Sequence, residues 1–482
     1  MEFLFGRKLE MADIDLLNVQ TGSVAAPAGC GKTHLIATSL LHHDDVKPVL
    51  ILTHTNAGVA ALRARLQNMG VPRKAYRITT IDGWAMRLIG TFPQRSGHPA
   101  NTLALKNPRR DYPAIRAGAQ SIFNGNHLRD VLQATYANLI VDEYQDCVLE
   151  QHAMVSKIAE VLPTCVLGDD MQAIFGWGNN VLVNWQTDVQ ATFPAIGQLE
   201  TPWRWKNVGT EDFGKWLLWV REALRTGAPI DLRTAPPEVQ WVQIAGEADV
   251  ASLTRASNVK PPNEGGNVLI VCDSTRPQRH RQIASRAYGA VVVENADLTD
   301  FIHFSESFEF HAPDAVDKII DFAGATLTGV GAAQFKQRVK SIQAGTARNP
   351  PTEAETTAIN FVNVPNSSNA VALLVEINKQ QGVTSLRPAL LRTCIQAFNA
   401  CPNADDFYEM AVKAREQTRV LGRSLPKRAV GSTLLLKGLE ADVAVIIDTD
   451  KLTARDLYVA MTRGSRQLLI CSRNPILNRA PV

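Results

Sequence analysis

The sequence lacks most of the features that mark membrane, secreted or zinc-binding proteins. Seven cysteines occur singly among 482 residues, without a Cys-x-x-Cys pair, which argues against a zinc site and a disulfide framework. No apolar run approaches the roughly 18 residues needed to span a bilayer. The first residues carry acids and lack the apolar core of a signal peptide. We therefore expect a cytoplasmic protein with no membrane segment.

An excess of charge of one sign is also missing. The net charge is only +3, with 50 basic and 47 acidic residues. Any surface that binds nucleic acid must therefore be local. Hydrophobic residues make up 45% and charged residues 20% of the chain, as in ordinary globular proteins, and the length suits roughly three domains.

Short apolar runs rich in β-branched residues predict parallel sheets. They recur at 49–53, 138–143, 165–170, 267–273, 443–448 and 467–472. Helical stretches lie between them, and several runs end in an acid or a threonine. This alternation is typical of an α/β fold whose sheets are covered on both faces, with ligands bound beyond the carboxyl ends of the strands.

One stretch, "AAPAGCGKTH" at 25–34, has the pattern of a Walker A loop. Such a loop turns backbone N–H groups around phosphate oxygens, and the helix that follows adds its positive end. Lys32 would reach the outer phosphates of ATP, and the Thr33 hydroxyl would ligate Mg²⁺. A glycine-rich turn that opens an ordinary helix is the alternative for the motif alone. The predicted nucleotide-binding residues here are Ala26, Pro27, Ala28, Gly29, Cys30, Gly31, Lys32 and Thr33.

Cys30 lies inside this loop. A thiol surrounded by inward N–H groups at a helix amino end should have a lowered pKa. We therefore expect Cys30 to be more reactive than a buried cysteine.

Two strand ends carry further candidate residues. In "VDEYQDC" (141–147), Asp142 is placed to hold Mg²⁺ and Glu143 to deprotonate the attacking water. A cap or solvated turn is the alternative for an isolated Asp-Glu pair. In "VLGDDMQAIFGW" (166–177), Gln172 could sense the γ-phosphate and Trp177 could stack on a base, whereas Phe175 could equally be a core residue.

Together with these motifs, five more segments, in order, resemble the UvrD/Rep-type helicases of superfamily 1. They are "LTHTNAGVAALRARL" (52–66), "TTIDGWA" (79–85), "LETPWRW" (199–205), "STLLLKGLEADVAVI" (432–446) and "LYVAMTRGSRQLLI" (457–470). Compact proteins of this kind are also similar to the helicase subunit of Gabija-type anti-phage systems.

The resemblance implies roles for individual residues. Arg204 and Arg463 match the family's arginine fingers, which neutralise charge on the transferring phosphoryl group. Trp203 and His34 would lie on opposite faces of the adenine. Glu440, in the Lys-Gly-Leu-Glu motif with Gly438, would accept a hydrogen bond from the ribose. The residues that match single-stranded DNA contacts are Thr55, Asn56, Thr80 and Trp177.

The resemblance also implies two RecA-like motor domains with ATP between them. Motor domain 1A would comprise 1–90 and 134–198, and motor domain 2A would comprise 199–295 and 425–482. Residues 91–133 would be a reduced accessory insertion 1B, and residues 296–424 a helical insertion like 2B. Arg109 and Arg110 lie in the basic first insertion and could flank the DNA. A solvated loop is the alternative for that interval.

The predicted function is an ATP- and Mg²⁺-dependent translocase or helicase, acting 3′→5′ on single-stranded or tailed DNA. The alternative is an ATP-switched subunit that regulates a nuclease partner in anti-phage defence and unwinds little DNA itself. A small-molecule P-loop kinase is disfavoured, because such an enzyme has no need for the motifs around Arg204, Glu440 and Arg463.

Overall fold

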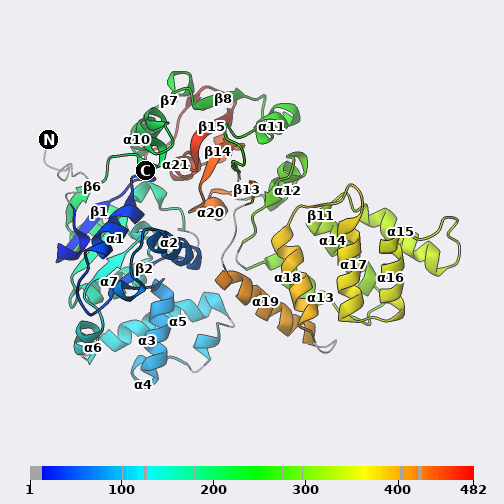
Figure 1. Ribbon diagram of the computed structural model, residues 1–482, viewed down its shortest axis with the longest axis horizontal. Helices are drawn as coiled ribbons and strands as arrows, with labels where there is room; N and C mark the ends of the chain where they lie inside the picture. The colour runs from blue at the N-terminus through cyan, green and yellow to red at the C-terminus, as the bar shows by residue number, and fades with distance from the viewer. Residues whose placement is uncertain are drawn as a thin grey trace. The chain divides into compact units, whose positions relative to one another are not determined.

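The computed structural model describes residues 14–99, 101–105, 107–123, 127–176, 181–273, 275–295, 297–401, 406–421 and 426–482 (Figure 1). These residues form two compact units. The first contains the described residues of Met1–Trp241, Asp450–Ile470 and Asn474–Val482, and the second those of Val242–Thr449 and Cys471–Arg473. Within the described ranges, no helix is long and apolar enough to cross a membrane.

A six-stranded parallel sheet forms the centre of the first unit. Its strand order is β3-β2-β4-β5-β1-β6, and every neighbouring pair is parallel. The carboxyl ends of the strands therefore meet at one edge, where ligands bind in such sheets. The strands are β1 (Thr21–Ala25), β2 (Val49–Thr53), β3 (Tyr76–Thr80), β4 (Leu139–Val141), β5 (Thr164–Gly168) and β6 (Ala195–Gln198).

Helices cover both faces of this sheet, which explains why β2 is apolar throughout. Leu50 and Leu52 pack with α3, α5, α6 and α7, while Val49 and Ile51 pack with α1 and α2. The helices of this unit are α1 (Lys32–Leu41), α2 (Asn56–Asn68), α3 (Ile81–Thr91), α4 (Pro93–Ser96), α5 (Pro108–Phe123), α6 (His127–Thr135), α7 (Leu149–Ala159), α8 (Gln190–Thr192), α9 (Trp203–Lys206), α10 (Glu211–Thr226) and α21 (Ala454–Met461). A two-residue pair, β7 (Ile230–Asp231) with β16 (Ile476–Leu477), is antiparallel.

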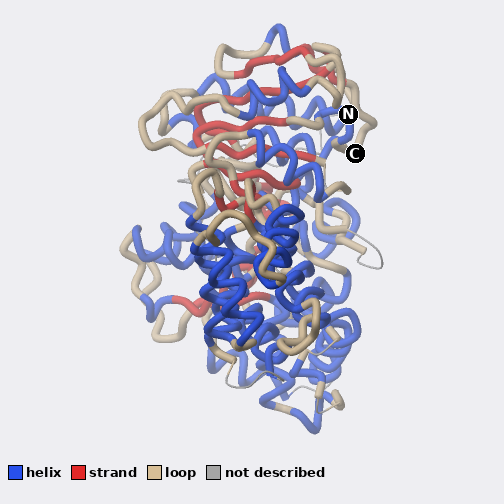
Figure 2. The backbone as a smooth tube through the Cα atoms, turned by 90° about the vertical axis from the view of Figure 1, so that its right-hand side faces the viewer, coloured by secondary structure: helices blue, strands red, loops and turns tan. Residues whose placement is uncertain are grey.

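A second six-stranded sheet has the order β10-β13-β9-β14-β15-β8, with parallel pairing from β10 to β14. Figure 2 shows the strands in red among blue helices. The strands are β8 (Val239–Gln243), β9 (Val268–Cys272), β10 (Val291–Val292), β13 (Arg428–Ser432), β14 (Ala441–Ile446) and β15 (Gly464–Ser472). The helices α11 (Val250–Ser257), α12 (Pro277–Arg286) and α20 (Thr433–Leu436) belong to the second unit.

The rest of the second unit is a group of helices with a core rich in phenylalanine. Phe398 and Phe407 stack with ring centroids 4.3 Å apart, and Phe304, Phe308 and Phe310 surround them. The helices are α13 (Thr299–Ser307), α14 (Ala315–Thr326), α15 (Ala332–Gln343), α16 (Glu353–Asn363), α17 (Ser367–Lys379), α18 (Pro388–Asn399) and α19 (Phe407–Leu421), with a short antiparallel pair, β11 (Leu327–Thr328) and β12 (Thr384–Ser385).

The α/β class and the helical insertions predicted from the sequence are confirmed. All six predicted strand runs contain strands, namely β2, β4, β5, β9, β14 and β15. Helix α16 begins at Glu353, shortly after Pro350 and Pro351. The Thr352 hydroxyl accepts a hydrogen bond from the Glu355 backbone N–H, and the Glu355 carboxylate accepts one from the Thr352 backbone N–H, a capping box that starts the helix. The domain boundaries stay a prediction.

Candidate nucleotide-binding site

The Walker A segment forms a tight loop between β1 and α1. Gly31, which caps α1, has φ = +92°, and Gly29 has φ = +72°, a left-handed conformation that glycine adopts without strain. A Cβ on Gly29 would lie 2.4 Å from Cζ3 of Trp205, so a side chain has no room there. The loop leads into the amino end of α1, where free N–H groups and the helix dipole favour an anion.

The Lys32 side chain lies against the two carboxylates that follow β4. Its Nζ is 3.1 Å from Oδ1 of Asp142 and 2.5 Å from Oε1 of Glu143. Burial alone would lower the pKa of Lys32, but the charges of Asp142 and Glu143 outweigh burial and raise that pKa above its ordinary value. Lys32 therefore stays protonated, and three candidate residues from two separate motifs lie in one cluster.

Glu143 is held in an unusual conformation. Its φ is +58°, which few residues other than glycine adopt, and its backbone N–H donates to Oδ1 of Asp142 at 2.9 Å. The amide of Gln145 donates to Oε2 of Glu143 at 2.6 Å. Lys32 holds one carboxylate oxygen and Gln145 the other, so the side chain is fixed at the edge of the sheet.

A chain of hydrogen bonds continues from Gln145 to α10. Oε1 of Gln145 accepts from the Asp169 backbone N–H at 3.1 Å. The Asp169 carboxylate accepts from Gln172 at 3.0 Å and from Nε of Arg221 at 2.9 Å. Because Asp169 and Arg221 are both almost fully buried, this pair is shielded from water. Glu143 is thus connected to α10 through side chains that lie far apart in the sequence.

The sequence motifs did not point to Asp169 or Arg221 as site residues. Arg221 lies in "WLLWVREALRT" of α10, at a position of the helix's buried stripe together with Phe213, Leu217 and Leu224. In the sequence, Arg221 is notable only as a charged residue at an apolar position of an amphipathic helix. Such a residue must find a partner of opposite charge, but the sequence does not say which one.

The donor atoms suit a magnesium ion. Thr33 and Asp142 offer a hydroxyl and a carboxylate oxygen, the hard ligands that Mg²⁺ binds together with substrate phosphates. The Thr33 hydroxyl lies 3.3 Å from Nη1 of Arg65. Among the described residues, no group of three or more His, Cys, Asp or Glu side chains gathers as a metal site. That Thr33 and Asp142 hold Mg²⁺ stays a prediction.

The segments around Arg204 and Tyr458 contact the Walker A loop within the first unit. The Arg204 backbone N–H donates to the Gly29 carbonyl at 3.0 Å, and the hydroxyl of Tyr458 accepts from the Ala28 N–H at 3.3 Å. The Arg204 guanidinium donates to the Thr462 carbonyl at 2.6 Å. These contacts hold the loop against both segments.

Arg463 is 3% exposed, and its Nε donates to the Val459 carbonyl at 2.8 Å. Its Nη2 donates to the Thr462 hydroxyl at 2.9 Å. Arg463 therefore braces the end of α21 in this structure, and its role as an arginine finger stays a prediction, as does that of Arg204.

The other candidates for nucleotide contact lie in both units. His34 is exposed in the first turn of α1, and Trp203 lies beneath Nζ of Lys206, which is 4.9 Å from the ring centroid. Gly438, with φ = +81°, and Glu440 belong to the second unit, between α20 and β14. Their roles toward adenine and ribose stay predictions.

The expectation for Cys30 is wrong. The residue is 1% exposed and packs in the core beneath the loop, with Sγ 3.8 Å from the Ala28 carbonyl oxygen. Burial, together with the charge of Asp169, raises the pKa of the thiol to about 12. The Cys30 side chain lies in the core, so burial outweighs any stabilisation of the thiolate by the loop.

The predicted DNA contacts in the first unit lie at neighbouring strand ends. Thr55 caps α2 and accepts from the Gly58 N–H at 3.0 Å, and Thr80 caps α3 and accepts from the Gly83 N–H at 2.9 Å. Because Thr80 pairs with Thr53 at the ends of β3 and β2, both helix amino ends lie at the same edge of the sheet. Asn56 is exposed beside Thr55.

The remaining DNA candidates differ in how far the structure places them. Trp177 lies outside the described residues. Arg109 is exposed on α5. Arg110 is exposed as well, but its guanidinium donates to Oδ1 of Asp111 at 3.1 and 3.2 Å, and Asp111 is buried. Arg109 is therefore the freer of the two cations.

Comparisons with known proteins show what this chain is similar to. Residues 103–190 match the family model of the UvrD/REP helicase N-terminal domain. No curated protein sequence matches the chain significantly. Two similar solved structures are an arterivirus nonstructural protein 10 (helicase) in complex with DNA and the Pif1 helicase from Candida albicans. The arterivirus structure has 11% identity, covers 95% of this chain and 63% of its own, and has a TM-score of 0.34. The Pif1 structure has 13% identity, covers 94% of this chain and 92% of its own, and has a TM-score of 0.39.

This chain therefore spans less than two thirds of the arterivirus structure. The match to the UvrD/REP helicase N-terminal domain covers residues 103–190, which is less than half of the chain.

Proposed function

We propose that the protein is an ATP-driven motor that moves along single-stranded DNA in the 3′→5′ direction. The observation that carries the proposal is the cluster in which Lys32 of the Walker A loop contacts Asp142 and Glu143. A phosphate-binding loop, oxygen ligands for a metal and a carboxylate base at one sheet edge are the parts that ATP hydrolysis needs. The direction rests on the resemblance to UvrD/Rep-type helicases.

In the proposed reaction, Lys32 exchanges Glu143 for the phosphates of ATP, because both partners are anionic oxygens. Glu143 is then still held through Oε2 by Gln145, with Oε1 able to accept a proton. It takes that proton from water as the water oxygen attacks the γ-phosphorus and the bond to ADP breaks. Mg²⁺ at Asp142 and Thr33 would neutralise phosphate charge.

A set of contacts links this reaction to the predicted DNA residues. Glu143 is bound to Gln145 and Gln145 to Asp169, which begins the short helix Asp170–Gln172. Just after that helix, the ring of Phe175 lies 5.1 Å from that of His54, the neighbour of Thr55. A ligand that binds one arrangement of these side chains better than another changes the population of both sites. DNA at Thr55 can thereby favour the arrangement that hydrolyses ATP.

Displacement of streptavidin tests the motor and its direction. Single-stranded DNA carrying biotin at the 5′ end or at the 3′ end is mixed with streptavidin, the protein and ATP. A 3′→5′ motor strips streptavidin from the 5′ end and leaves the 3′ end occupied. The Glu143→Gln variant, which keeps the shape of the side chain but not the base, is the control and should strip neither end.

The nuclease-regulating alternative gives a different result. A switch subunit hydrolyses ATP in the presence of DNA but does not displace streptavidin from either end. Faster displacement from the 3′ end would overturn the proposed direction and leave the motor in place.

A further inference from the structure

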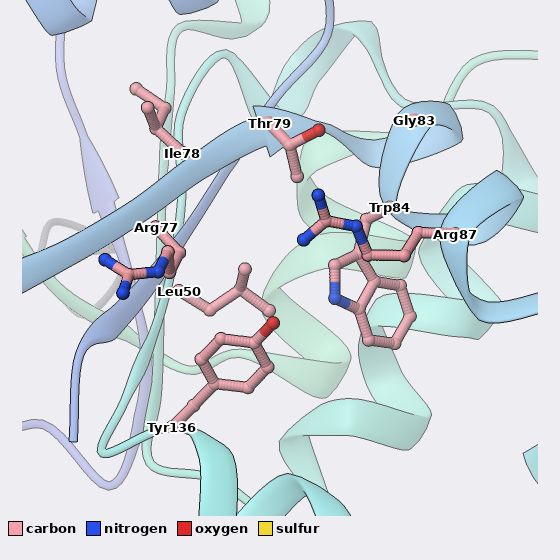
Figure 3. Close-up of a pocket in the computed structure, with 8 residues that line it drawn as sticks. All are labelled: Leu50, Arg77, Ile78, Thr79, Gly83, Trp84, Arg87 and Tyr136. Carbon is pink, nitrogen blue, oxygen red and sulfur yellow. The ribbon is translucent and has the colours of Figure 1, made fainter. Parts of the chain in front are cut away.

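A pocket of about 190 Å³ opens at the β3 edge of the first sheet, four strands away from the Walker A strand β1 (Figure 3). Its lining includes Leu50 of β2, Arg77 and Thr79 of β3, Trp84 and Arg87 of α3, and Tyr136, which precedes β4. This volume is below the roughly 300 Å³ at which pockets for drug-sized ligands begin, so the pocket suits a single ring.

The pocket is cationic. Figure 3 shows the Arg77 and Arg87 guanidinium groups at opposite sides of the opening. None of the lining residues is acidic. The nearby acid Asp82 is already neutralised, because Arg116 donates to both of its carboxylate oxygens at 2.8 Å. The charge of the pocket therefore favours an anion.

Polar groups in the pocket also lack partners. Arg77 donates Nη1 to the backbone carbonyls of Arg73 and Tyr76, which fixes its position. In contrast, the Arg87 guanidinium and the hydroxyls of Thr79 and Tyr136 form no hydrogen bond or ion pair to any residue that the structure describes. Figure 3 shows the Tyr136 hydroxyl and the Arg87 guanidinium both directed into the opening. A ligand with anionic oxygens could satisfy them.

The walls suit a flat ring. The indole of Trp84, the phenol ring of Tyr136 and the apolar side chain of Leu50 line the pocket. An aromatic face and a nearby guanidinium are the combination that binds a nucleobase and its phosphate, and stacking does not depend on which base is present. The pocket therefore matches one nucleotide.

Its position indicates where that nucleotide comes from. Thr79 lines the pocket, and the next residue, Thr80, is a predicted DNA contact at the amino end of α3. We propose that the pocket binds one nucleotide of the single-stranded DNA, with the base against Tyr136 and Trp84 and a phosphate on Arg87. This proposal rests on the proposed function, because it assumes that DNA reaches Thr80.

Photocrosslinking tests the position directly. Oligothymidine carrying one 5-iodo-deoxyuridine is bound to the full chain and irradiated, and the crosslinked peptide is identified by mass spectrometry. The expected crosslink is on Trp84 or Tyr136. Monomeric 5-iodo-deoxyuridine monophosphate is tested in parallel. A monomer that crosslinks in the pocket while the oligonucleotide does not would overturn the assignment to DNA.

Binding measurements with variants provide the second readout. Tyr136→Leu should lower DNA affinity roughly tenfold without changing its salt dependence, because stacking is lost. Arg87→Gln should reduce the salt slope by about 0.7, the value for one phosphate contact to a single strand. Arg233→Gln, at an exposed arginine that does not line the pocket, should change neither.

The outcomes separate this proposal from the proposed function. If DNA stimulates ATP hydrolysis but the crosslinks fall elsewhere and both variants bind like the wild type, the pocket assignment is overturned and the motor stands. If the wild type binds no DNA at all, both are overturned. If Tyr136→Leu does not fold, the crosslink and Arg87→Gln decide the matter.

Discussion

Two helical segments interrupt the sheets, and they are built differently. Helices α5 and α6 share one hydrophobic core with β2, β4 and α3 of the first unit. Helices α13 to α19 enclose a core whose described buried residues all lie between Leu298 and Ala414. Both segments are predicted accessory insertions, but the first shares the hydrophobic core of the first unit, whereas the second has a core of its own.

This difference has a consequence for function. A segment that shares its core with the sheet transmits any disturbance to the strand ends at Asp142 and Thr80. A segment with its own core can lose packing without disturbing the nucleotide site. We therefore expect substitutions in the two segments to separate into two classes.

The largest expected effects come from core truncations. Phe398→Ala in the second segment should cost about 3–5 kcal/mol of stability and Ile115→Ala in α5 about 2–5 kcal/mol, since both side chains are completely buried. Protease sensitivity and binding of a fluorescent ATP analogue are measured for each. Ile115→Ala should weaken nucleotide binding, whereas Phe398→Ala should expose only the second segment to protease. Equal loss of nucleotide binding in both variants would contradict the comparison.

Cysteine reactivity compares the Walker A loop of the first unit with the helical segment of the second unit. Cys30 stays protonated at pH 8 because its pKa is raised to about 12, whereas Cys401, at the end of α18, is partly exposed. An alkylating reagent at pH 8 should therefore modify Cys401 first. The Cys30 rate should rise about tenfold per pH unit as thiolate forms below pH 12. Inactivation at pH 8 through Cys30, with protection by ATP, would refute this.

The ion pair between Arg116 of α5 and Asp82 of α3 should have an intermediate effect. Arg116→Met leaves the half-buried Asp82 without its two hydrogen bonds and should cost about 1–3 kcal/mol. Changing Asp82→Leu as well should recover part of that loss, because no unpaired charge remains. Arg129→Met, at an exposed position of α6, is the control and should change the denaturation midpoint little. If the stability changes of Arg116→Met and Asp82→Leu simply added, a direct interaction between Arg116 and Asp82 would be contradicted.

These residues also show what the sequence could predict. The Walker A loop and the acids after β4 depend on local geometry, so neighbouring residues predict them. The raised pKa of Cys30 depends instead on burial in the core and on the charge of Asp169, a residue far along the chain. The partners Asp169 of Arg221 and Asp82 of Arg116 lie 52 and 34 residues away, and no local pattern specifies such pairs.

The smallest expected effect concerns the salt dependence of DNA binding. Arg109→Gln on α5 should reduce the slope by about 0.7 if this cation contacts a phosphate. Arg110 should contribute less, because it is already bound to Asp111. The matched control is Arg392→Gln on an exposed position of α18. If only Arg392→Gln changed the slope, the DNA path would lie along the second segment.

The rate of ATP hydrolysis with and without single-stranded DNA tests whether the proposed nucleotide site is catalytic and is coupled to DNA binding. Lys32, Asp142 and Glu143 form the proposed site, and hydrogen bonds connect Glu143 through Gln145 to Asp169. Steady-state hydrolysis is measured for the wild type and for Glu143→Gln over a range of DNA concentrations. We expect DNA to raise wild-type turnover severalfold, while Glu143→Gln binds ATP and does not hydrolyse it. Equal turnover with and without DNA, or wild-type hydrolysis by Glu143→Gln, would contradict this expectation.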